Sequence, residues 1–429
     1  MLTQEDKKFI LDRGSDVSTV ETQIQNFITN FPFLPIEKAA AIGAGVIQLD
    51  KSRISALNAS YEKKAAKKKV LKFVPASGAA TRMFKELFAF LDNEDFDGNE
   101  AVKKFMTGLK DFAFYEELSG KLGDQINDPK SAVSTLLHDM EYGTLPKALL
   151  SFHSYENKAR TPLEEHLVEG AKYAESANNE VHIHFTVSPH HQAKFEQLVA
   201  KVKTLNESAF GVQYQITFSQ QKNATDTIAV DANNEPFRED DGTPLFRPAG
   251  HGALLENLNE LDADVIFIKN IDNVVPDRLK EDTVVYKKAL AGLLLDCQQE
   301  VFDLINNEIK DPVKSAATLE AKYSITMKNG FGDLSNEEQV TYIRQRLDRP
   351  IRVCGMVKNT GEPGGGPFWV SAKDGSTSLQ IAETAQIDLD DPQKAELLKN
   401  STHFNPVDLI CATKNSAGKK FDLLTYRDD

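Results

Sequence analysis

A run of small residues between an apolar strand pattern and a helical pattern could bind phosphate. It lies in VPASGAATRMFK, residues 74–85. Backbone N–H groups can approach a phosphate closely where side chains are small, and the positive end of the following helix dipole favours an anion. Arg82 adds a fixed cation. The residues of this predicted phosphate loop are Gly78, Ala79, Ala80 and Thr81. A tight strand-to-helix turn with an exposed arginine explains the same pattern equally well, and neither a Walker loop nor a G-x-G-x-x-G fingerprint is present.

Two further charged residues could act on phosphates. Lys147 directly follows Pro146, and a lysine fixed at the mouth of a sheet is a compact cation suited to a triphosphate. Asp272 follows the apolar run VIFIK. Ligands of open α/β sheets bind beyond the carboxyl ends of strands, where a carboxylate can hold Mg²⁺ between phosphate oxygens. We expect Arg82 and Lys147 to be catalytic cations and Asp272 to bind the Mg²⁺ cofactor; a solvated lysine and an Asp-Asn helix cap are the alternatives.

Histidines occur in two places that suggest a ligand site. His251 lies between Gly250 and Gly252 at a predicted helix start, where a base, a ribose or a phosphate could lie against the backbone. A glycine-rich helix cap is the alternative. His182 and His184 share one face of a predicted strand, so a transition metal is conceivable, but hydrogen-bonded packing histidines are the favoured interpretation.

The elements that must position these residues alternate between strands and helices over residues 66–390. This alternation predicts an α/β domain with a mostly parallel central sheet flanked by helices. Residues 1–65 are predicted to form an N-terminal helical segment, residues 93–145 a helical insertion and residues 391–429 a C-terminal segment. The remaining predictions concern local structure: a helix over residues 36–49, a capping box formed by Thr161, Pro162 and Glu164, and a last strand over residues 420–426.

Composition narrows the class of function. The formal net charge is −14, which disfavours nucleic-acid binding because such affinity depends on clustered Lys and Arg. No apolar run approaches the ~20 residues that span a bilayer, and the first residues are too polar for a secretory signal, so we expect no membrane partner and a cytoplasmic location. Cys297, Cys354 and Cys411 are far apart and are expected to be buried thiols.

Taken in chain order, these segments resemble the UDP-sugar pyrophosphorylases, nucleotidyltransferases of the glycosyltransferase-A type of fold. SGAATRMFK resembles their G-G-x-G-T-R-L/M loop, PKALL their Pro-Lys-x-Leu-Leu element, and RPAGHGALLENL the stretch bordering the nucleotide. VIFIKNIDN resembles the strand whose Asp binds the metal. The resemblance further implies that Gln220, in FSQ, reads the uracil edge and that Glu383, in LQIAETAQI, accepts sugar hydroxyls. The chain also resembles an uncharacterised bacterial family of unknown function.

The resemblance implies transfer of a nucleotidyl group from a nucleoside triphosphate, with UTP favoured, to a sugar 1-phosphate with release of pyrophosphate. Such transfer needs positioning and charge neutralisation more than covalent chemistry by the protein. Ser77, Ala79 and Ala80 stand where the pyrophosphorylases usually have glycines. Two alternatives therefore stay open: a glycosyltransferase of the same fold that uses a nucleotide-sugar donor, and a non-catalytic nucleotide-sugar binder.

Overall fold

The computed structural model describes residues 2–93, 95–156, 158–361 and 364–427, apart from the side chain of His251. The chain divides into two compact units. Unit 1 comprises Met1–Lys69, Gln221–Ile268 and Lys288–Asp429, and unit 2 comprises Val70–Gln220 and Lys269–Lys287. Among the described residues, no helix is both long and apolar enough to cross a membrane.

Unit 2 contains three parallel strands in the order β4-β7-β8. Their bounds are Val70–Pro75 for β4, Glu180–Thr186 for β7 and Gln213–Ser219 for β8. The register aligns Pro75 with Thr186 and Thr186 with Ser219, so the carboxyl ends of all three strands lie at one edge. Almost all of β4 and most of β7 are buried, as in a parallel sheet covered on both faces.

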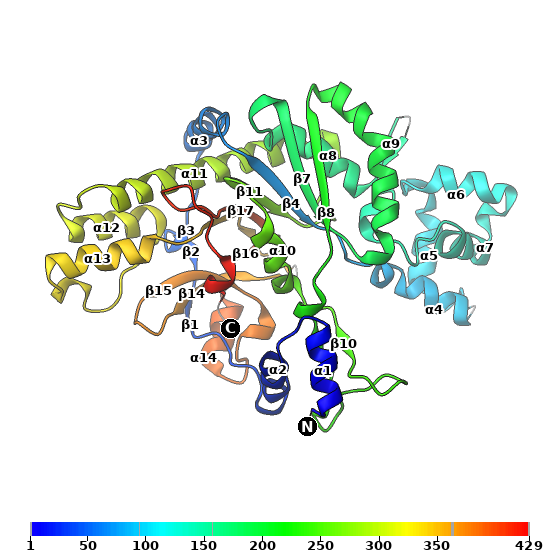
Figure 1. Cartoon of the computed structure of the whole chain (residues 1–429). Coiled ribbons are helices and arrows are strands. Elements are labelled where there is room, and N and C mark those ends of the chain that lie inside the picture. Colours follow the sequence, from blue (N-terminus) through cyan, green and yellow to red (C-terminus); the bar gives the residue numbers. More distant parts are fainter. Residues whose placement is uncertain (1, 94, 157, 362–363, 428–429) are drawn as a thin grey trace. The chain divides into compact units, whose positions relative to one another are not determined.

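Two helices of unit 2 cover one face of these strands. Helix α8 (Pro162–Tyr173) packs beside β7, and α9 (Gln192–Phe210) beside β8 (Figure 1). Alternate residues of β7 enter one hydrophobic cluster with apolar residues of both helices. Helix α8 begins as the sequence predicts, because Thr161 and Glu164 form a reciprocal capping box and Pro162 follows the cap.

Most of the described residues between 95 and 139 in unit 2 lie in short helices. These helices pack with α4 around an aromatic cluster that contains Phe84, Phe105, Phe114 and Tyr142, and Figure 1 shows them gathered in cyan. The bounds of these helices are Lys85–Asn93 for α4, Glu100–Thr107 for α5, Tyr115–Leu122 for α6 and Pro129–Ser134 for α7. A short hairpin then leads to α8, with β5 at His153–Tyr155 and β6 at Lys158–Arg160.

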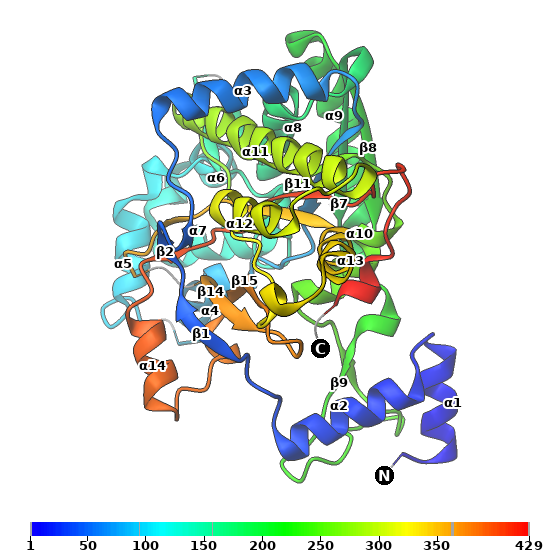
Figure 2. The ribbon, with the colours of Figure 1, turned by 90° about the vertical axis from the view of Figure 1, so that its left-hand side faces the viewer.

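Unit 1 brings together the two ends of the described chain and its middle. Its helices are α1 (Gln4–Asp12), α2 (Val17–Thr29), α3 (Lys51–Ala65), α10 (Leu255–Glu260), α12 (Pro312–Tyr323), α13 (Asn336–Leu347) and α14 (Pro392–Lys399). The long helix α11 (Lys280–Asn306) begins in unit 2 and continues into unit 1, where α3 lies alongside it (Figure 2).

The strands of unit 1 are mostly short. They are β1 (Ile36–Ala39), β2 (Ala41–Ile42), β3 (Gly45–Val46), β9 (Thr227–Ile228), β10 (Phe246–Arg247), β11 (Val265–Lys269), β12 (Ile351–Cys354), β13 (Val357–Lys358), β14 (Gly366–Ser371), β15 (Thr377–Ala382), β16 (His403–Phe404) and β17 (Asp408–Ala412). Strand β12 pairs with β17 in the antiparallel sense. The six-stranded sheet is therefore mixed and not purely parallel.

Two local predictions are wrong. Residues 36–49 form β1, β2 and β3 instead of a helix, because β1 pairs antiparallel with β14 and Ile36 is fully buried there. Positive φ angles at Gly43 and Gly45 also interrupt any helix. Residues 420–426 form no strand; they end in a short 3₁₀ helix, Leu423–Tyr426, which the Asp422 side chain caps.

Candidate functional site

The predicted phosphate loop pairs with the segment that carries Lys147. Ala79 and Pro146 form an antiparallel bridge. The N–H of Lys147 donates to the Gly78 carbonyl oxygen at 3.3 Å, and the N–H of Ala80 donates to the Leu145 carbonyl oxygen at 3.4 Å. The loop that follows β4 therefore holds the backbone of Lys147 beside it, although helices α4 to α7 lie between the two in the sequence.

The side chain of Lys147 makes an ion pair with Asp272. Lys147 Nζ lies 2.6 Å from Asp272 Oδ2, and the two side chains are 29% and 35% exposed. Asp272 follows β11, as Gly78 follows β4. Lys147 and Asp272, which the sequence predicted for the same phosphate site, are thus in direct contact. Both side chains remain accessible to a solute.

Arg82 and the loop backbone are open to solvent. Arg82 lies in a 3₁₀ helix, Thr81–Phe84, that leads into α4, and its side chain is exposed. Among the described residues, the guanidinium makes no ion pair within 4.0 Å. A Cβ atom built on Gly78 would meet no atom within 4 Å, so the loop is not pressed against other protein atoms. Ala80, in contrast, is fully buried and anchors the loop in the aromatic cluster.

Gln220 lies at the same edge of the parallel strands as the loop. It directly follows β8, whose end is in register with the ends of β7 and β4. Its amide nitrogen donates to Gln192 Oε1 at the start of α9, at 2.9 Å. The predicted uracil-reading amide is thus exposed and oriented by a neighbouring glutamine.

The other predicted site residues belong to unit 1. Gly250 precedes the 3₁₀ helix His251–Leu254, and a Cβ built on Gly250 or on Gly252 would meet no atom within 4 Å. The side chain of His251 lies outside the described part of the structure. Glu383 is exposed after β15, and its N–H donates to Gln386 Oε1 at 3.0 Å. Their roles toward a ligand stay predictions.

A buried charged network supports this edge of unit 2. Glu169 of α8 is fully buried and receives Lys72 Nζ on one carboxylate oxygen and Lys269 Nζ on the other, both at 2.8 Å. Burial alone would raise the pKa of the Glu169 carboxyl, but the two ammonium groups outweigh it and hold that pKa well below its usual range. Burial lowers the pKa of Lys72 to about 7 against the opposing attraction of Glu169.

Glu165, one helical turn earlier on α8, gathers a second set of partners. Its carboxylate accepts hydrogen bonds from the Tyr155 hydroxyl at 2.7 Å and from Lys280 Nζ at 2.8 Å, and His153 Nδ1 lies 2.9 Å away. Arg160 in turn makes two 2.8 Å contacts to Asp277. The chain after β11 is therefore attached to α8 through charged side chains.

His166 of α8 holds the backbone immediately before Asp272. Its Nε2 lies 3.2 Å from the carbonyl oxygen of Asn270 and 3.1 Å from that of Ile271, so it must donate to them. Burial, followed by repulsion from Lys72, lowers the pKa of His166 well below its usual range. A neutral imidazole with its proton on Nε2 therefore positions the loop that carries Asp272.

Asp272 offers a carboxylate, which is the kind of ligand that Mg²⁺ binds in proteins. Mg²⁺ is commonly bound by one or two carboxylates together with substrate phosphates and water. The described residues contain no group of three or more His, Cys, Asp or Glu side chains that could hold a metal by themselves. In the histidine pair of β7, both ring nitrogens of His184 are hydrogen-bonded: Nδ1 lies 2.8 Å from Thr217 Oγ1, and Nε2 lies 2.8 Å from Ser219 Oγ. A resident transition metal is not supported there.

The charged network of α8 is not predicted by the sequence pattern. The pattern of α8 marks a capped helix, and acidic residues in a helix are usually solvated. Glu164, Glu165, His166 and Glu169 are nevertheless all buried. The available signal was indirect: Lys72 and Lys269 each lie within an apolar strand, where a lysine needs a buried partner.

One protein-family model matches almost the whole chain, over residues 3–429. The chain belongs to this family, described as Domain of unknown function (DUF4301). A comparison with curated proteins finds no match.

Several solved structures are similar to this chain. A mutant of UDP-glucose pyrophosphorylase from Leishmania major, in complex with UDP-glucose, is 13% identical over 95% of this chain and 62% of its own, with a TM-score of 0.42. A second mutant of that enzyme is 14% identical over 96% and 63%, also with a TM-score of 0.42. A UDP-glucose phosphorylase from Trypanosoma brucei is 11% identical over 95% and 61%, with a TM-score of 0.38. The chain thus spans less than two thirds of these proteins.

Proposed function

We propose that this protein transfers a nucleotidyl group from a nucleoside triphosphate, with UTP the favoured donor, to a sugar 1-phosphate and releases pyrophosphate. The observation that carries the proposal is the convergence in unit 2 of three segments selected for phosphate chemistry. The loop after β4 pairs with the backbone at Lys147, and Lys147 pairs with Asp272. The order of the motifs in the sequence supports the same reaction.

The proposed mechanism assigns each group a charge-stabilising role. The sugar phosphate oxygen attacks the α-phosphorus of the triphosphate, and the bond from that phosphorus to the bridging oxygen of pyrophosphate breaks. Backbone N–H groups of Gly78 to Thr81 and the side chains of Arg82 and Lys147 neutralise the phosphate oxygens as charge moves to pyrophosphate. Asp272 would hold Mg²⁺, which would supply further charge neutralisation of the phosphates.

The ion pair between Lys147 and Asp272 also suits this role before substrate arrives. Each partner compensates the other at 2.6 Å, so neither is an unpaired charge in the half-buried site. The phosphates of a bound nucleotide would offer the lysine an anion, and Mg²⁺ would offer the carboxylate a cation. Each group would then exchange one opposite charge for another.

The test is release of pyrophosphate from UTP and a panel of sugar 1-phosphates in the presence of Mg²⁺. We expect saturable release by the wild type, and a decrease of about 10²- to 10³-fold in kcat for Lys147→Ala, as for removal of one preorganised transition-state donor. Asp272→Asn should raise the Mg²⁺ concentration needed for half-maximal rate. Lys201→Ala, which removes an exposed lysine of α9, is the matched control and should leave the rate unchanged.

The same assay separates the other two functions. Release of a nucleoside diphosphate from a nucleotide-sugar, without pyrophosphate, would identify a glycosyltransferase. Nucleotide binding without turnover, unaffected by Asp272→Asn, would identify a non-catalytic binder. Either result contradicts the proposal.

A further inference from the structure

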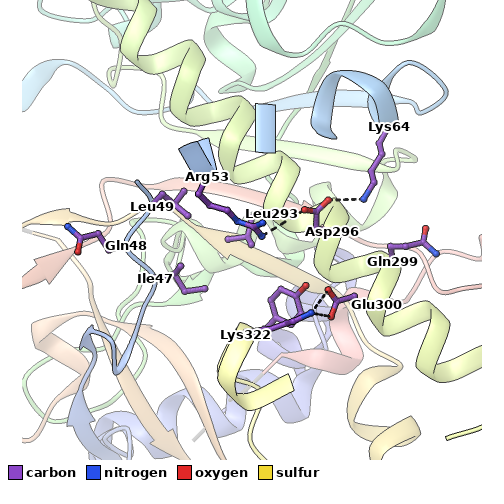
Figure 3. Close-up of a pocket in the computed structure, with 11 residues that line it drawn as sticks. Ile47, Gln48, Leu49, Arg53, Lys64, Leu293, Asp296, Gln299, Glu300 and Lys322 are labelled. Atoms are coloured by element: carbon purple, nitrogen blue, oxygen red, sulfur yellow. Dashed lines mark hydrogen bonds and ion pairs between the residues drawn. The ribbon is translucent and has the colours of Figure 1, made fainter. Parts of the chain in front are cut away.

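Unit 1 contains a pocket that shares no residue with the candidate site. Its volume is about 580 Å³, within the range of about 300 to 1,000 Å³ that small-molecule sites occupy. The walls come from the chain before α3 and from helices α3, α11 and α12 (Figure 3). The lining residues are Ile47, Gln48, Leu49, Arg53, Lys64, Leu293, Asp296, Gln299, Glu300, Lys322 and Tyr323.

The apolar part of the pocket belongs to a packed core. Leu293 is buried in a cluster with Leu57 and Ala289, and Leu49 and Tyr323 pack against that cluster. Helices α3 and α11 approach so closely that a Cβ on Gly292 would overlap the backbone oxygen of Leu57. The floor is therefore fixed by helix packing, which makes the pocket a preformed cavity.

Both carboxylates in the pocket already have partners. Asp296 Oδ1 accepts from Ser60 Oγ at 2.6 Å and from Lys64 Nζ at 2.8 Å. Both oxygens of Glu300 lie 3.0 Å from Lys322 Nζ (Figure 3). Burial alone would raise the pKa of Asp296, but the bonds from Lys64 and Ser60 outweigh it and lower that pKa. Each carboxylate is compensated by a lysine, so the pair offers little attraction to an added cation.

Arg53 is the charged group with unused capacity. Its guanidinium pairs with Asp296 Oδ2 at 4.0 Å, and its side chain is 51% exposed. A guanidinium has five N–H donors in a planar fork that matches a carboxylate or a phosphate. Three cations against two carboxylates leave the lining with one net positive charge, and the 4.0 Å contact of Arg53 with Asp296 is longer than the lysine contacts of the two carboxylates. The pocket thus combines an apolar floor with one available cation.

We propose that this pocket binds a small organic anion, in which a carboxylate or a phosphate contacts Arg53 and a short aromatic or aliphatic group lies on Leu49, Leu293 and Tyr323. Inorganic anions lack the apolar group and bind less tightly. Organic cations meet Arg53 and bind less tightly as well. The proposal does not depend on the nucleotidyl-transfer reaction, because none of the pocket residues belongs to the candidate site.

Isothermal titration calorimetry on the full chain tests the proposal with four probes: benzoate, phenyl phosphate, inorganic phosphate and benzylamine. We expect benzoate or phenyl phosphate to bind at least about tenfold more tightly than the other two. The tighter of these two probes identifies the head group that the pocket prefers. Arg53→Gln should weaken its binding by at least about tenfold.

Two control variants locate the bound anion. Lys51→Gln removes an exposed cation from the first turn of the same helix and should leave the dissociation constant unchanged. Lys147→Ala should also leave it unchanged. Absence of binding by both aromatic anions, equal affinity in the wild type and in Arg53→Gln, or a loss caused by Lys147→Ala alone would each overturn the proposal. The last result would place the anion at the candidate site in unit 2.

Discussion

Glu169→Gln should destabilise the protein strongly, because Glu169 is the shared counter-ion of two buried lysines. The glutamine amide can accept from only one of Lys72 and Lys269, and its NH₂ group must face the other ammonium. Removal of one partner from a buried ion pair costs about 3 to 5 kcal/mol. We expect a loss of that size in the free energy of unfolding at pH 6, measured by urea denaturation with an unchanged m-value.

The deficit should shrink as the pH rises. In the variant the pKa of Lys72, already lowered to about 7 by burial, falls further because the carboxylate that opposed this shift is absent. The unfolded lysine keeps its proton up to about pH 10.4, so the unfolded state binds more protons than the folded state, and stability increases with pH. At pH 9 a neutral lysine replaces the buried charge, and the difference from the wild type is expected to be smaller than at pH 6.

The matched control is Glu141→Gln. Glu141 makes an exposed ion pair with Lys194 at 2.6 Å, and such pairs contribute about 0 to 1 kcal/mol. Adding Lys72→Met to the Glu169→Gln variant should recover part of the lost stability at pH 6, because it removes one uncompensated buried charge. If Glu169→Gln loses no more than Glu141→Gln at both pH values, the network does not stabilise the fold as argued.

Two further predictions concern stability. In the wild-type background, Lys72→Met should flatten the increase in unfolding free energy between pH 7 and 9. Lys72 has a pKa of about 7 in the folded state, so in this pH range it has lost its proton in the folded protein and keeps it in the unfolded chain. An unchanged slope in urea titrations would contradict the assignment. Gly292→Ala should lower the unfolding free energy by about 1 to 3 kcal/mol because its Cβ would overlap the Leu57 backbone oxygen. Gly120→Ala, in the open interior of α6, is its control and should cause no loss.

The sequence determined the features that depend on neighbours in the chain. Thr161 caps α8 because its hydroxyl reaches an N–H three residues ahead, and this reach is local. The apolar runs before Gly78 and before Asp272 form strands whose ends expose polar residues. The sequence also showed that Lys147 directly follows Pro146. These signals were enough to select the groups that converge in unit 2, but not to show that Lys147 and Asp272 touch.

The tertiary structure decided the features that depend on residues far apart in the chain. Residues 36–39 are rich in helix-compatible side chains, yet pairing with β14 makes them a strand. Glu169 of α8 resembles a solvated helix residue, yet it is buried, and lysines from β4 and β11 neutralise it. Periodicity and capping record local geometry, whereas burial and ion pairing are set by which distant segment packs alongside. That is why the loop after β4 could be located in the sequence, whereas the charged network of α8 was visible only in the folded chain.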